Sequence, residues 1–149
     1  MLKYRRQTSP QTLKNGLQEY HKKYPHLLQS PELAAELGEL FKHHDVIHVV
    51  FGCDISFHDE ILTDVWSIFG STISLMSYLS YLKYPEITDI VKEIGLIKAF
   101  VIFLGTVLDA VRVFLRTLQM TKKWPWKDYE IYLDKPLCEI RAEFGIKVL

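Results

Sequence analysis

The sequence predicts an all-α protein, folded as a single domain of five or six mostly antiparallel helices. Three observations support this prediction. Apolar residues recur with helical spacing through most of the 149-residue chain. Pro and Gly interrupt that pattern at intervals, which implies short connections and therefore antiparallel neighbours. The hydrophobic content of 48% is enough for one core at this length, so we treat residues 1–149 as one domain.

The first half of the chain carries the clearest helix boundaries. A first helix is expected over residues 11–24, after a short basic N-terminal arm that lies within residues 1–30. A second helix is expected from Pro31 to about Phe51, because Ser30 is a good capping residue and Pro is favoured at the first helical position. Gly52 then ends this helix.

The second half is predicted with longer helices. One helix is expected from His58 to about Leu82, with two acidic residues in its first turn. A further helix follows from Glu86 to about Met120, with a bend at Gly95 or Gly105, and a last short helix stops at Gly145. Two breaks separate these elements, at the segments Lys83–Glu86 and Trp124–Trp126. Tyr129–Leu133 has strand-like composition but no evident partner.

Charge is unevenly distributed although the net charge is zero. Residues 1–30 hold six basic residues and one acid, whereas residues 31–64 hold eight acids and one base. A neutral chain argues against nucleic acid as a partner. The acidic block favours a cation, although a solvated acidic surface has the same composition. The first residues lack the apolar segment of a secretory signal, so we do not expect a secreted protein.

The acidic block contains the segment His43-His44-Asp45-Val46-Ile47-His48. On a helix, His44, Asp45 and His48 can converge on one point, and Glu60 at the start of the next helix can close the site. Two imidazoles and carboxylates suit a divalent cation, most readily zinc, with iron, cobalt or manganese as alternatives. Asp64 lies one turn after Glu60 and is a candidate for orienting the ligands from outside.

Other interpretations remain open for these residues. Two histidines four apart on a helix often only pack or face solvent, and Asp64 can equally be an exposed acid. A metal phosphohydrolase of the HD type also places adjacent His and Asp on a helix. That interpretation requires Asp109, with His21 or His26, as further ligands, whereas the preferred one requires Glu60.

Two motifs resemble one known family. The segment HDVIHVVFGCDISFHDE has the pattern HDxxH, eleven residues, then Glu, and PLCEIRAEFGI has the pattern PLxxxRxExGI near the C-terminus. Both resemble the metal-binding ubiquinone (coenzyme Q) biosynthesis protein, the fourth numbered protein of that pathway. The resemblance covers roughly residues 40–149, and WPWKDYEIY fits the same region. The family has a longer N-terminal portion than the 40 or so residues that precede the motif here.

The resemblance implies an all-α fold and a divalent metal at His44, Asp45, His48 and Glu60. It implies a role with polyprenylated benzenoid intermediates of ubiquinone, including loss of the ring C1 carboxyl with replacement by oxygen. The alternative is a non-catalytic prenyl-lipid-binding or scaffold protein with a structural metal. Implied partners are a polyprenyl lipid or quinone precursor, other quinone-biosynthesis proteins and a membrane surface, and a homodimer is compatible. The implied location is cytoplasmic or membrane-peripheral in a bacterium, and the matrix side of the inner membrane in a mitochondrion.

Several further residues fit that implied function. The apolar stretches over residues 65–82 and 97–118 suit buried helices and can line a groove for a prenyl chain, although ordinary core packing produces the same pattern. Arg112 and Arg116 are candidates for a carboxylate or phosphate head group, or simply for helix C-terminal cations. The lysines around Trp124 and Trp126 suit either a lipid interface or a solvated turn over buried tryptophans.

Overall fold

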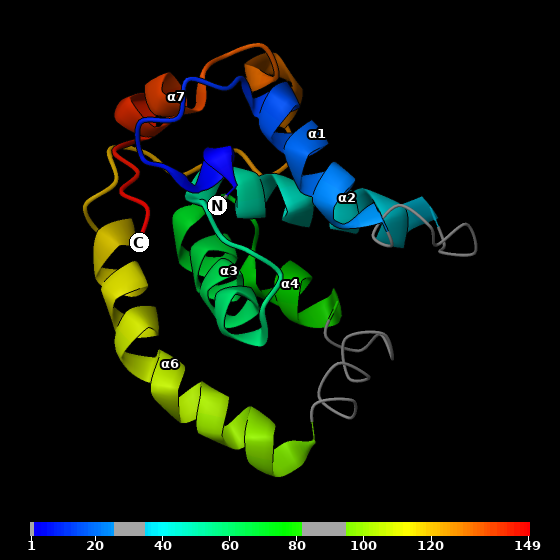
Figure 1. The fold of residues 1–149 in the computed structure, drawn as a ribbon, viewed down its shortest axis with the longest axis vertical. Helices are drawn as coiled ribbons and strands as arrows, with labels where there is room; N and C mark the ends of the chain where they lie inside the picture. Colours follow the sequence, from blue (N-terminus) through cyan, green and yellow to red (C-terminus); the bar gives the residue numbers. More distant parts are fainter. Residues whose placement is uncertain (1, 26–34, 82–94) are drawn as a thin grey trace.

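Helices make up the regular structure of this protein in a computed structural model that describes residues 2–25, 35–81 and 95–149. The predicted all-α class is confirmed, and the described residues form a single domain without a β-strand (Figure 1). The α-helices are α1 (Leu13–Lys23), α2 (Ala35–Phe51), α3 (Phe57–Gly70), α4 (Leu75–Tyr81), α6 (Leu96–Thr117) and α7 (Leu137–Phe144). Two short 3-10 helices are η1 (Lys3–Arg5) and η3 (Tyr129–Tyr132).

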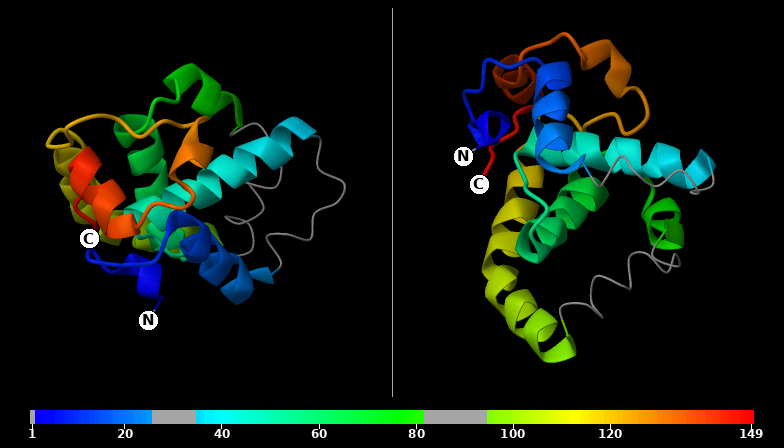
Figure 2. Two further views of the ribbon diagram at one scale, coloured as in Figure 1. Left: turned by 90° about the horizontal axis from the view of Figure 1, so that it is seen from above. Right: turned by 45° about the vertical axis from the view of Figure 1, so that its right-hand side comes forward.

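Helix α2 lies at the centre of the molecule and packs against α1 on one side and α3 on another (Figures 1 and 2). Helix α6 lies along α3 and extends beyond it (Figure 1). The C-terminal half of α2 is buried because Val46, Ile47, Val49, Val50 and Phe51 are all at most 2% exposed. The central position of α2 places His48, which is 1% exposed, within the core, and leaves His44 partly exposed beside it.

The N-terminal segment is part of the domain rather than a separate arm. Thr12 caps α1 by accepting a hydrogen bond from the Asn15 amide, which confirms the predicted first helix. Tyr4, Leu13 and Tyr20 are at most 1% exposed and belong to the main hydrophobic core. The apolar residues of this segment therefore hold α1 against α2.

The helix predicted from His58 to Leu82 is wrong in its length. The described chain divides into α3 and α4, with residues 71–74 between them. The amide of Trp124 donates to the Gly70 carbonyl and the Thr72 amide donates to the Trp124 carbonyl, so a distant segment takes the backbone groups that a continuous helix would use. Ser74 then starts α4, because its hydroxyl accepts from the Ser77 amide.

Other boundaries lie partly outside the described residues. The start of the second predicted helix at Pro31, and the break at Lys83–Glu86, fall in segments that are not described. The helix predicted to start at Glu86 is described from Leu96 as α6, directly after Gly95 with its positive φ of 85°. The strand considered for Tyr129–Leu133 is wrong: residues 129–132 form η3.

The end of the last helix is as predicted, and Gly145 makes it possible. Its φ of 69° is in the left-handed region, and a Cβ added there would lie 2.9 Å from the Thr121 backbone nitrogen. We expect Gly145→Ala to lower the free energy of unfolding by about 2 kcal/mol, from the strained φ and the backbone contact together. Urea denaturation measures this, with Gly38→Ala as the control because a Cβ there meets no atom within 4 Å. Equal stability of both variants would contradict the prediction.

None of the helices that the structure describes is long and apolar enough to cross a bilayer.

Candidate metal centre

Two consecutive helices bring three of the four predicted ligands together. His44 and His48 lie one turn apart on α2, and Glu60 lies in the first turn of α3. The connection between these helices is short because Gly52, with φ of 76°, ends α2 and Ser56 caps α3 by accepting from the Asp59 amide. This turn folds the start of α3 back towards the histidine face of α2.

His44, His48 and Glu60 form a group with the geometry of a metal site. One ligand atom from each lies within 4.8 Å of the others. The Nε2 atom of His48 is 3.4 Å from Glu60 Oε1, and Nε2 of His44 is 3.9 Å from Glu60 Oε2. Ligand atoms about 2.1 Å from a tetrahedral zinc ion lie roughly 3.4 Å from one another. Small side-chain movements would therefore bring all three groups onto one ion.

The charges at this site also suit a divalent cation. Burial and the neighbouring His48 lower the pKa of His44, which keeps its imidazole neutral and able to bind a metal. Burial opposes ionisation of Glu60, but the adjacent His48 outweighs it, so the pKa of Glu60 is lowered and the carboxylate is charged. Burial disfavours charge on His48 as well, yet Glu60 raises the pKa of this histidine. A bound cation would take the place of the proton between His48 and Glu60.

The other two predicted carboxylates occupy different positions. Asp45 Oδ2 lies 2.8 Å from His21 Nε2 of α1, and Asp45 is not a member of the group formed by His44, His48 and Glu60. Asp64 Oδ1 is 4.0 Å from His44 Nε2 and also accepts a hydrogen bond from Tyr78 of α4. Asp64 therefore faces the same His44 nitrogen as Glu60, beyond hydrogen-bond distance, so its role in orienting the ligands stays a prediction. Asp45 instead links α2 to α1.

His48 has two neighbours that the sequence analysis did not identify. The Tyr20 ring stacks on its imidazole, with centroids 5.4 Å apart and planes inclined by 25°. The Thr63 hydroxyl lies 3.3 Å from His48 Nδ1. Thr63 is one turn after Glu60, so helical spacing from a predicted ligand was the signal for it. Nothing local in the sequence places Tyr20, because its contact depends on how α1 packs.

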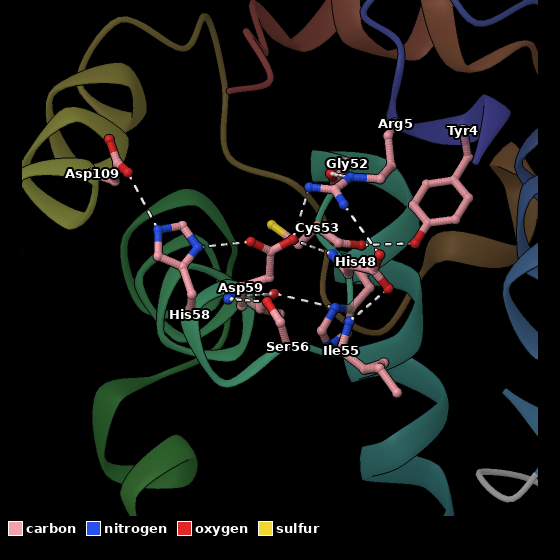
Figure 3. Close-up of polar contacts among 12 residues, drawn as sticks. Tyr4, Arg5, His48, Gly52, Cys53, Ile55, Ser56, His58, Asp59 and Asp109 are labelled. Atoms are coloured by element: carbon pink, nitrogen blue, oxygen red, sulfur yellow. Dashed lines mark hydrogen bonds and ion pairs between the residues drawn. The ribbon is translucent and has the colours of Figure 1, made fainter. Parts of the chain in front are cut away.

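A polar chain surrounds the start of α3 and reaches His48 through Thr63 (Figure 3). Asp59 accepts hydrogen bonds from Arg5 and from the Asp54 amide, and His58 lies between Asp59 and Asp109 of α6, at 2.9 and 3.3 Å. Asp109 also pairs with Arg112 at 2.7 Å. Asp109 thus ties α6 to α3 and is not among the described residues grouped around His44 and His48, which removes geometric support from the HD-type interpretation.

An apolar groove runs between α3 and α6, on a different face of α3 from Glu60 and Asp64. Its volume is about 330 Å³, and Ile61, which follows Glu60 directly, is one of its walls. The remaining walls are apolar side chains from both helices: Val65, Phe69, Phe103, Val107, Ala110, Val111 and Phe114. Several of them are more than one third exposed, as are Ile97, Phe100 and Leu104 elsewhere on α6. An apolar face this long is unusual on a protein without a hydrophobic ligand or partner.

The basic and aromatic candidates take mainly structural positions. Arg112 is engaged by Asp109, and Arg116 donates to the Lys147 carbonyl at 3.1 Å. Trp124 and Trp126 are at most 5% exposed, so these tryptophans belong to the core and their lysine neighbours form a solvated turn.

Comparison with protein-family models, with curated proteins and with solved structures gives no significant match for this chain.

Proposed function

We propose that this protein is a metal-dependent member of the ubiquinone-biosynthesis type, acting on or holding a polyprenylated benzenoid intermediate. One observation carries the proposal: His44, His48 and Glu60 form a group on α2 and α3 that can hold a metal, and another face of α3 borders the apolar groove shared with α6. A polar ring with an apolar tail needs both kinds of environment, and α3 contributes to each. The two sequence motifs that resemble the family support the same proposal.

Each part of the chain has a distinct role in this proposal. His44, His48 and Glu60 hold a divalent ion, most readily zinc, and three protein ligands leave a position open for a ring oxygen. When bound, the metal supplies Lewis acidity to the ring carboxylate and phenol oxygens. The α3–α6 groove takes the first part of the tail and excludes water from it.

The proposed reaction replaces the ring C1 carboxyl with a hydroxyl group. The carboxyl leaves as carbon dioxide, water supplies the hydroxyl oxygen, and molecular oxygen accepts the two electrons and becomes hydrogen peroxide. A second candidate is a non-catalytic lipid carrier or scaffold, and one observation favours it. The metal group joins α2 to α3, so an ion there would clamp two helices regardless of any chemistry. The proposed setting in both cases is a membrane surface, with other quinone-biosynthesis proteins as partners.

Assay of zinc-loaded protein with a farnesylated 4-hydroxybenzoate, with oxygen present and product analysed by mass spectrometry, tests the proposal. Loss of the carboxyl and gain of oxygen, dependent on the metal, is the expected result for the enzyme. Tight binding of the same compound without turnover supports the carrier. Neither binding nor turnover by the metal-loaded protein would contradict both.

The groove makes a separate prediction that does not depend on turnover. Ala110→Trp is expected to weaken binding of the farnesylated compound by about tenfold or more, equivalent to about 1.4 kcal/mol, because the new ring fills the groove. Leu108→Trp is the matched control, since Leu108 is 71% exposed and lines no part of this groove. Fluorescence titration measures both affinities. Equal affinity in the two variants would show that the tail binds elsewhere.

A further inference from the structure

His48 is the most buried residue of the metal group, with 1% of its side chain exposed. Its imidazole has two nitrogens, and only one of them can serve as ligand. Nε2 faces Glu60 Oε1 at 3.4 Å, whereas Nδ1 faces the Thr63 hydroxyl at 3.3 Å. A neutral imidazole binds a metal through the nitrogen that carries no proton, so the partner of the other nitrogen decides which one is available.

The Thr63 hydroxyl must accept from His48 Nδ1, rather than donate to it, when its own proton is engaged elsewhere. That proton is donated to the Asp59 carbonyl, 2.8 Å away and one turn earlier on α3. Thr63 is fully buried, so water does not compete for the hydroxyl. The oxygen is then left to accept from His48 Nδ1–H, and the Nε2 lone pair of the imidazole points towards Glu60.

We propose that Thr63 is a positioning residue of the metal centre, which fixes His48 in the Nδ1–H tautomer and so makes Nε2 the ligand atom. This inference depends on the metal site of the proposed function. Metal-bound histidines commonly donate their second N–H to a neighbouring oxygen, and loss of that partner lowers affinity about 10- to 100-fold. Here the acceptor for His48 Nδ1–H is the Thr63 hydroxyl, whose own proton is donated to the Asp59 carbonyl of α3. The Tyr20 ring, stacked on the imidazole, limits rotation of the plane.

Thr63→Val tests this role because it removes the hydroxyl with little change in shape. We expect the zinc affinity of the full chain, measured by competition with a chromophoric chelator, to fall about 10- to 100-fold. Thr63→Ser keeps the hydroxyl and should restore most of that loss. Thermal unfolding of the metal-free variants separates weaker metal binding from a general loss of fold.

The tautomer itself can be read without a variant. Long-range ¹H–¹⁵N spectra of the zinc-loaded wild type should show His48 protonated at Nδ1 and bound through Nε2. Coordination through Nδ1, or wild-type affinity in Thr63→Val, would overturn the role of Thr63 while leaving the metal site intact. A wild-type protein that binds no zinc would instead overturn the proposed metal site, and this inference with it.

Discussion

Replacing His48 with Ala, or Glu60 with Ala, is expected to reduce bound zinc from near one equivalent to background. The loss should exceed the roughly 10- to 100-fold that changes outside the ligand shell produce, because each variant removes a ligand. Metal content by mass spectrometry and competition with a chelator measure it. Glu39→Ala is the control: Glu39 is an exposed acid on the same helix as His48, paired only with Lys42 among the ion pairs described for it.

Two further variants separate the alternatives for the remaining ligands. Asp45→Asn should retain zinc, because Asp45 pairs with His21 rather than with the three-residue group. Loss of zinc in Asp45→Asn would favour the four-ligand site that the family resemblance implies. Asp109→Asn should also retain zinc, since this carboxylate pairs with His58 and Arg112. Dependence on Asp109 without dependence on Glu60 would favour the HD-type interpretation.

The largest effect on stability is expected from Arg141→Met. Arg141 is fully buried, and its guanidinium donates to the carbonyls of Val49 and Val50 at the end of α2 and of Tyr4 and Arg6 in the N-terminal segment. Burial lowers the pKa of Arg141 to about 10, so the side chain stays charged at neutral pH. These bonds join α7, the end of α2 and the N-terminus in a single contact.

Arg141→Met leaves several buried carbonyls without a partner. Each unsatisfied carbonyl lowers the free energy of unfolding by about 1–3 kcal/mol. We expect the free energy of unfolding to fall by at least about 3 kcal/mol, which for a chain of this length lowers the thermal midpoint by roughly 10 °C. Differential scanning calorimetry measures the change. Arg112→Met, at a side chain 66% exposed on α6, should change stability by less than about 0.5 kcal/mol. Similar midpoints for the two variants would contradict the assigned role of Arg141.

Local signals in the sequence account for the helices that were predicted well. Thr12, Gly52 and Gly145 mark helix ends through side-chain capping or a positive φ, and both properties belong to the residue itself. The break after Gly70 was missed because it depends on backbone bonds to Trp124, which lies far away in the sequence. Periodicity over Val65–Leu82 contains no information about that contact.

The same difference between local signals and long-range packing explains which residues of the site could be predicted. His44, His48 and Glu60 were predicted because helical spacing and a short connection fix their relative positions. Asp45 is adjacent to His44 in sequence, yet its partner is set by the packing of α1, which supplies His21. Arg141 was noted only as part of a motif, because its four carbonyl acceptors come from two distant segments.

X-ray absorption at the zinc edge of the zinc-loaded wild-type protein tests the central claim most directly. The account predicts one zinc bound by two imidazole nitrogens, from His44 and His48, and by oxygen from Glu60 and solvent. The spectrum should lose the two-imidazole signature in His48→Ala. Failure of the wild type to retain zinc, or a first shell containing sulfur from Cys53 or Cys138, would contradict the assigned metal centre.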